Sequence, residues 1–74
     1  MAKFGPEPRY SRLQELFLLR SARLGALAHR YSQHSDAPAE YGTLIAWALR
    51  STLEDCAQLE VYGEAVALVL DRGD

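Results

Sequence analysis

A short turn signal divides this sequence into two long stretches that contain no proline. The signal is the segment Ser35–Pro38, which reads Ser-Asp-Ala-Pro and combines residue types that favour turns and helix starts. The stretch before it, from Tyr10 onward, is about 25 residues long, and a helix of that length measures about 37 Å. A short connection between two long helices makes them antiparallel neighbours. The sequence therefore predicts an all-α fold built as an antiparallel two-helix hairpin.

The expected elements follow from this division. They are a flexible N-terminal arm at residues 1–9, a first helix at about 10–34, a turn at 35–38 and a second helix at about 38–70, with the hairpin as a whole covering residues 10–72. Ser11 is the expected N-cap of the first helix, and Ser35 or Asp36 that of the second. Gly63 marks a point where the second helix can break, since glycine inside a helix costs about 1 kcal/mol relative to alanine. The alternative for the valine-rich C-terminal stretch is a strand, which would have no partner strand in this chain.

Helical periodicity gives each predicted helix an apolar face. In the first helix this core stripe consists of Tyr10, Leu13, Phe17, Leu24, Ala28 and Tyr31. Beside it runs a series of small residues that would let another helix approach closely, namely Ser21, Gly25, Ala28 and Ser32. The second helix has a packing face that includes Thr52 and Cys56, and it has a further apolar group on the opposite side, made of Leu44, Trp47, Val61, Tyr62, Ala65 and Val69. One partner helix cannot cover both sides.

This further apolar group is the main reason to expect self-association. Two helices packed together each bury one stripe, and an exposed apolar patch that contains a tryptophan is typical of an interface. A chain of 74 residues buries too little surface to be very stable alone, and the single cysteine, Cys56, offers no disulfide framework. The sequence therefore predicts a homodimer in which two hairpins form a four-helix bundle.

Charge is divided unevenly between the two halves of the chain. Residues 1–35 carry six basic and two acidic side chains, whereas residues 36–74 carry two basic and eight acidic ones. Five arginines recur on one side of the first helix and interleave with leucines, namely Arg9, Arg12, Arg20, Arg23 and Arg30. Two interpretations stay open. The arginines pair with acidic residues of the second helix, such as Glu54, Asp55 or Glu60, or they contact successive phosphates of a nucleic acid.

The residue types needed for catalysis or metal binding form no recognisable pattern. His29 and His34 point about 140° apart on a helix and cannot share a metal ion. Cys56 falls on an apolar face, where it is expected to be a small buried hydrophobe. The sequence also contains no glycine-rich phosphate loop and no nucleophile elbow. We therefore expect no enzymatic activity, no cofactor and no metal.

The expected function is that of a small non-enzymatic adaptor or regulatory protein that acts by protein–protein interaction, of the inhibitor or anti-activator type. The residues expected to bind a partner, which is a second copy or another protein, are Trp47, Leu44, Tyr62, Val61, Val69, Arg20, Arg23 and Arg30. The alternative is a nucleic-acid-binding hairpin dimer that uses the arginines of the first helix. No apolar run of about 18 residues and no signal-peptide pattern occurs, so we expect no membrane contact and a cytoplasmic location. The richness in alanine, leucine and arginine favours a bacterial, phage or plasmid origin.

Overall fold

The computed structural model describes residues 9–71, and these residues form three α-helices and no strand. The helices are α1 (Arg12–Ser32), α2 (Ala39–Gln58) and α3 (Tyr62–Leu70). The predicted all-α class is confirmed for this part of the chain. The alternative of a C-terminal strand is wrong, because the valine-rich stretch is helical. The flexible arm predicted for residues 1–9 lies outside the described residues, apart from Arg9.

The start of α1 is fixed by a capping box, as the sequence predicts at Ser11. The backbone N–H of Gln14 donates to Ser11 Oγ at 3.0 Å, and the backbone N–H of Ser11 donates to Gln14 Oε1 at 2.8 Å. This reciprocal pair satisfies two backbone donors that a helix start otherwise leaves without partners. The amide Nε2 of Gln14 also donates to the backbone oxygen of Leu59 at 2.8 Å, which ties the start of α1 to the end of α2.

The connection between α1 and α2 is longer than expected, at residues 33–38 in place of 35–38. Backbone N–H groups of Gln33 and His34 donate to Arg30 and Tyr31, and these bonds close the end of α1. The N-cap of α2 is Pro38, and no side chain in the described part of the chain caps this helix. The prediction that Ser35 or Asp36 caps the second helix is therefore wrong.

The single second helix expected at 38–70 is two helices, and the break lies before Gly63. Leu59 is the C-cap of α2, and the next residue, Glu60, has a φ of 67°. The N–H of Val61 donates to Cys56 O at 2.9 Å and that of Glu60 to Ala57 O at 3.1 Å. This pair of bonds is the Schellman motif, in which one left-handed residue ends a helix and satisfies its last carbonyls. The turn sends the chain back towards α1.

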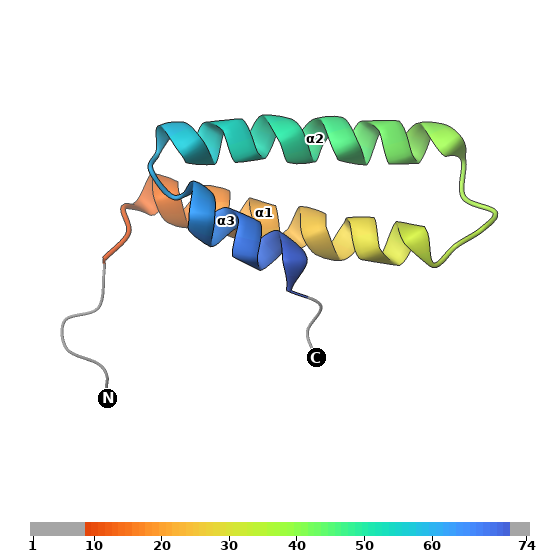
Figure 1. Cartoon of the computed structure of the whole chain (residues 1–74), viewed down its shortest axis with the longest axis horizontal. Coiled ribbons are helices and arrows are strands. Elements are labelled where there is room, and N and C mark those ends of the chain that lie inside the picture. The colour runs from red at the N-terminus through yellow and green to blue at the C-terminus, as the bar shows by residue number, and fades with distance from the viewer. Residues whose placement is uncertain (1–8, 72–74) are drawn as a thin grey trace.

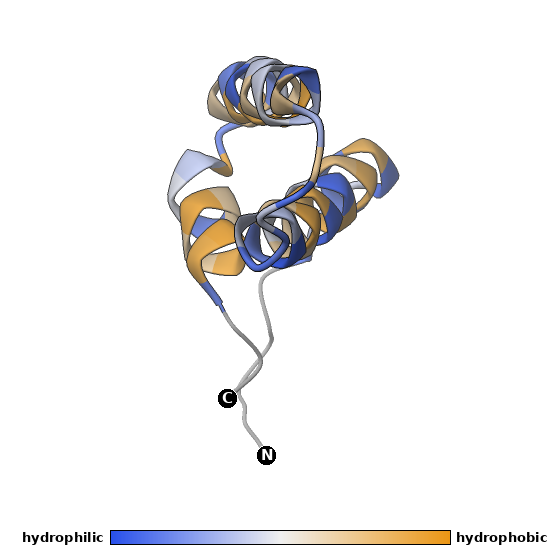
Figure 2. Ribbon diagram, turned by 90° about the vertical axis from the view of Figure 1, so that its right-hand side faces the viewer, coloured by the Kyte–Doolittle hydropathy of each residue, from blue (hydrophilic) through white to orange (hydrophobic). Residues whose placement is uncertain are grey.

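The three helices surround one small core (Figure 2). The helices α1 and α2 lie side by side and run in opposite directions, and α3 lies against α1 and runs in the same direction as α1 (Figure 1). The buried apolar side chains come from all three helices and from the turn before α3, and they are Leu18, Cys56, Val61 and Ala65. Ser21 and Thr52 are buried beside them.

The core face of α1 is rotated from the predicted stripe towards Leu18. The buried residues of α1 are Leu18, Ser21 and Gly25, whereas Leu13, predicted to be in the core, is exposed. The reason is that α3 packs on this side of α1. A Cβ atom placed on Gly25 would lie 2.6 Å from Val69 O, so the two backbones touch here. The predicted series of small residues does permit a close approach, at Ser21 and Gly25.

Candidate functional site

The side of α1 opposite the core carries leucines in contact with solvent. Leu13, Leu16, Leu19 and Leu27 are between 42% and 53% exposed. Together with Phe17, Leu24, Arg20 and Arg23 they line a shallow depression of about 480 Å3 along this one helix. A helix that is apolar on two sides is stable in water when other protein segments pack against both of them. Within the described chain, α1 has cover only where α2 and α3 lie.

Two further hollows lie between α1 and α2. The first is lined by Arg20 and Leu24 of α1 and by Trp47, Ala48, Ser51 and Thr52 of α2. The second, nearer the connection, is lined from α1 and the residues after it by Leu27, Arg30, Tyr31, His34 and Ala37, and from α2 by Tyr41 and Ile45. Neither lining includes an α3 residue among those described, which agrees with the view of α3 on one side of the α1–α2 pair (Figure 2).

We call the surface formed by these hollows and the adjoining leucines the open face. From α1 it takes Leu13, Leu16, Arg20, Arg23, Leu24 and Leu27, and from α2 it takes Leu44, Trp47, Ala48 and Ser51. Leu44 belongs to it because it precedes Trp47 by three residues and Ser51 by seven, which places the three on one stripe of α2. Trp47 is 65% exposed. The open face is therefore an apolar surface with guanidinium groups set into it.

The arginines of α1 and the residues before it are exposed, and within the described residues none forms an ion pair with a carboxylate. This holds for Arg9, Arg12, Arg20, Arg23 and Arg30. The guanidinium of Arg20 lies 5.2 Å from the centroid of the Phe17 ring, a cation–π contact within α1. Within one copy, the predicted pairs with Glu54, Asp55 or Glu60 do not form. The positive charges are thus available to another molecule.

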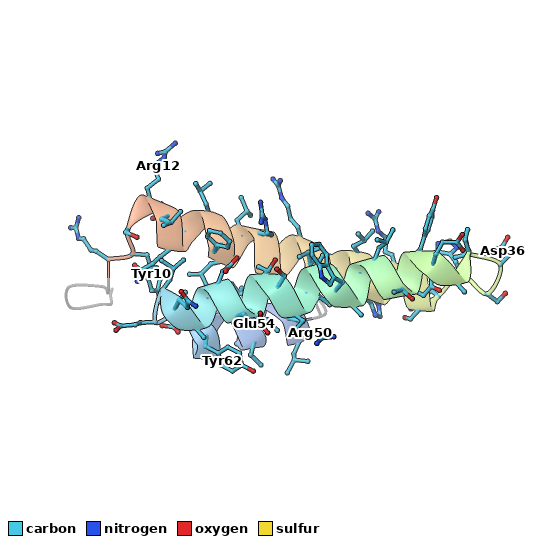
Figure 3. All side chains as sticks on the ribbon, turned by 90° about the horizontal axis from the view of Figure 1, so that it is seen from above. Tyr10, Arg12, Asp36, Arg50, Glu54 and Tyr62 are labelled. Atoms are coloured by element: carbon cyan, nitrogen blue, oxygen red, sulfur yellow. The ribbon has the colours of Figure 1, made fainter. Side chains whose placement is uncertain are left out.

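The structure separates the apolar residues that the sequence grouped on the second helix. Leu44 and Trp47 are exposed on α2, while Val61 is 1% exposed and Val69 is half-buried against Gly25. The prediction of Val61 as a partner-binding residue is therefore corrected, because the turn at Glu60 directs it into the core. Tyr62 is exposed at the start of α3, at the opposite edge from Arg12 and on the same side as Arg50 (Figure 3).

The polar groups of the core have structural partners. Cys56 Sγ lies 3.5 Å from Ser21 Oγ and 3.8 Å from Phe17 O, and Cys56 is fully buried, which confirms its predicted place. Tyr10 donates a hydrogen bond of 3.3 Å to Glu64 Oε2 and so joins the segment before α1 to α3. Partial burial raises the pKa of the Tyr10 hydroxyl, and the negative charge of Glu64 adds to this, so Tyr10 stays protonated as the donor at neutral pH.

Sequence reasoning missed the exposed leucines of α1. It placed Leu13 in the core, but Leu13 lies on the open face together with Leu16 and Leu27. The available signal was their heptad spacing with Arg20 and Arg23, which is the repeat of a helix seam. No group of three or more potential metal ligands occurs among the described residues.

Comparison of the chain with known protein families, with curated proteins and with solved structures gives no match. Within residues 9–71, no helix is both long enough and apolar enough to span a bilayer. The chemistry of the open face is therefore the basis for a function.

Proposed function

We propose that this chain is a non-enzymatic adaptor or regulatory protein that acts by protein–protein contact, and that its open face docks an amphipathic helix with carboxylates beside its apolar stripe. The observation that carries the proposal is the combination of half-exposed leucines on α1 with Arg20 and Arg23, which form no ion pair with any described residue. Burying the leucine side chains against a partner stabilises the complex by about 25 cal/mol per Å2 of apolar surface removed from water. The guanidinium groups need acceptors when they are covered, and carboxylates supply them bidentately.

A protein helix suits this surface better than a nucleic acid. Leu13 and Leu16 precede Arg20 and Arg23 at heptad spacing, and Leu27 follows them, so any ligand that reaches both arginines also covers leucines. A phosphate backbone would satisfy the arginines but would offer the leucines no apolar surface, and the net charge of the chain is −2. The exposed indole of Trp47 extends the same surface onto α2 and is typical of a binding hot spot.

Self-association is one way to supply such a helix. The four-helix bundle of two copies predicted from the sequence would cover the open face with a second open face. Action as an inhibitor or anti-activator in the cytoplasm fits a small interaction protein of this kind.

The test is a titration with a synthetic amphipathic peptide that has leucines on one face flanked by glutamates. Trp47 is the single tryptophan of the chain, so its fluorescence reports on the open face directly. We expect a saturable change for the wild type and a dissociation constant about tenfold or more higher for Leu27→Glu. The matched control is Leu70→Glu, because Leu70 is an exposed leucine on α3, outside the open face. Equal affinities for Leu27→Glu and the wild type would contradict the proposal.

Nucleic-acid binding is the second candidate, because the arginines from Arg9 to Arg30 are exposed and lack ion pairs within the described chain. It requires a mobility shift with double-stranded DNA or RNA that weakens steeply as salt is raised. The double variant Arg20→Ala/Arg23→Ala should then reduce the slope of log affinity against log salt by roughly two. A shift that does not depend on salt, or no shift at low salt, excludes this function.

A further inference from the structure

The second helix of this chain has the chemistry that the open face requires of its ligand. Leu44 and Trp47 form its exposed apolar stripe, and Glu40, Glu54 and Asp55 are exposed carboxylates near the two ends of α2. Because the open face also contains part of α2, a second copy can both offer this helix and receive one. The proposed function, on which this inference rests, requires such a ligand.

We infer that the occupant of the open face is a second copy of the chain, placed so that α1 of each copy packs on α2 of the other. The contact is isologous, which means that every pair of residues in it occurs twice. The α3 helices lie outside the resulting bundle of four long helices, since α3 is on the other side of the α1–α2 pair (Figure 2).

Contacts within one copy give the register of this crosswise packing. Phe17 lies near Cys56, Gln14 near Leu59 and Tyr31 near Gly42, and the residue numbers of each pair add up to 73. The contacts of Ser21 with Cys56 and of Tyr31 with Pro38 give sums four higher and four lower, so 73 is the centre of the register. A two-fold axis parallel to the helices keeps every residue at its own height. The same register therefore holds between α1 of one copy and α2 of the other.

In this register Arg20 and Arg30 of one copy come near acidic residues of the other copy's α2, while Arg23 comes level with Arg50, which lies on the α3 side of the molecule. Arg20 comes level with the turn of the other copy's α2 that contains Glu54 and Asp55. Arg30, at the other end of α1, comes level with Thr43, one turn from Glu40 in the first turn of that helix. Between these two charged levels, Leu27 meets the apolar stripe of Leu44 and Trp47.

The other arrangement of two antiparallel hairpins pairs α1 with α1, and charge disfavours it. Arg20 and Arg23 flank the middle of α1, so a two-fold axis across the helices would gather four guanidinium groups at one level. Like charges brought together in an interface repel, and the penalty grows as water is excluded. In that arrangement Glu54 and Asp55 would also face the other α2 and not the arginines of α1.

The crosswise arrangement has a distinctive test with two charge reversals. The Arg20→Glu variant alone brings its new carboxylate against Asp55 of the second copy at both symmetry-related sites of the dimer, and Asp55→Arg alone places two basic groups together at each site. A mixed dimer of the two variants contains one site with an attractive pair of reversed sign and one site with the original pair. We measure solution mass by light scattering, with helical content by circular dichroism as the check on folding, and both side chains are exposed in the structure.

We expect each variant alone to dimerise about tenfold or more weakly than the wild type, and an equimolar mixture to recover dimer formation. Arg50→Glu is the matched control, because Arg50 lies on the α3 side of the molecule (Figure 3), and it should leave dimer formation unchanged. An equimolar mixture that stays as weak as its parts would overturn the inference. Stronger dimer formation by Arg20→Glu alone would overturn it too, because α1–α1 packing places the new carboxylate of each copy level with Arg23 of the other.

The same measurements separate this inference from the proposed function. A wild-type chain that is monomeric at every concentration but still binds the acidic amphipathic peptide overturns the second copy as occupant and leaves the proposed function in place. A monomeric chain that binds no such peptide overturns both.

Discussion

At the scale of single residues, Glu60 holds the conformation on which the C-terminal third of the fold depends. Its φ of 67° is the only positive φ of a non-glycine residue among those described, and it occupies the position of the Schellman motif where glycine is usual. A side chain with a Cβ atom in the left-handed region costs roughly 1–2 kcal/mol. The chain tolerates this cost because the turn places Val61 and Ala65 in the core.

Replacing Glu60 by glycine should therefore stabilise the protein. We expect Glu60→Gly to raise the free energy of unfolding by about 1 kcal/mol, because the backbone strain is removed and Glu60 makes no side-chain hydrogen bond within the described residues. Urea unfolding followed by circular dichroism measures the change. Glu60→Ala is the control, since it removes the carboxylate but keeps the Cβ atom, and it should bring no such gain. Loss of stability in Glu60→Gly would show that this turn is not left-handed.

At the scale of elements, the contact of α3 with α1 depends on Gly25. The space for a Cβ atom at Gly25 is occupied by backbone atoms of Val69, at 2.6 Å and 2.8 Å, and backbone cannot move aside as a flexible side chain can. Gly25→Ala should therefore push α3 away from α1 and lower the free energy of unfolding by about 2 kcal/mol or more. Alanine's higher helix propensity, worth about 1 kcal/mol, offsets only part of this loss.

Gly63→Ala is the matched control for this prediction. Gly63 lies in α3, and a Cβ atom placed there would meet nothing within 4 Å. This variant should keep or slightly raise the free energy of unfolding, by up to about 0.5 kcal/mol near a helix end. Thermal melts of the two variants and the wild type measure these changes in stability. Equal melting temperatures for Gly25→Ala and Gly63→Ala would contradict the close packing of α3 on α1.

Features of the helices could be predicted from the sequence where they depend only on residues close together in the chain. The capping residue Ser11 and the small residues Ser21 and Gly25 were identified because caps and close helix contacts need particular side chains at particular spacings. The end of α2 could not be predicted in this way. A residue in the left-handed conformation is usually a glycine, whereas here it is Glu60. The nearest glycine, Gly63, is an ordinary helical residue of α3. The break predicted at Gly63 is therefore close to the observed one at Glu60 but not at the same residue.

The same turn decides how much of the candidate site was predictable. A continuous second helix would put Val61 and Trp47 on one outer side, as predicted from periodicity, whereas the turn rotates Val61 inward and leaves Trp47 outside. It also brings α3 against α1 and rotates the core towards Leu18, which exposes Leu13. The grouping of the arginines on one side was predictable because it follows from α1 alone, but whether they form ion pairs with carboxylates of the described residues depends on how the helices are placed.

At the scale of the whole molecule, the core is small for the apolar surface that the chain carries. Of the four buried apolar side chains among residues 9–71, Cys56 and Ala65 are small, and four leucines of α1 are about half exposed. Single domains of this size bury little more than half of their unfolded surface and have marginal stability. Covering the open face in a dimer would add the burial that one copy lacks, so folding and association should be linked.

Linkage of this kind makes the melting temperature depend on protein concentration. For a dimer that unfolds to monomers, a hundredfold higher concentration should raise the melting temperature by roughly 5–10 °C in a domain of this size. Leu27→Glu should flatten this dependence, since it places a carboxylate on the open face, while Leu70→Glu on α3 should leave it unchanged. Circular dichroism melts over that concentration range test all three proteins. A wild-type melting temperature that does not change with concentration would mean that one copy of this small core is stable without a partner, and the exposed leucines of α1 would then be left for a different protein to cover.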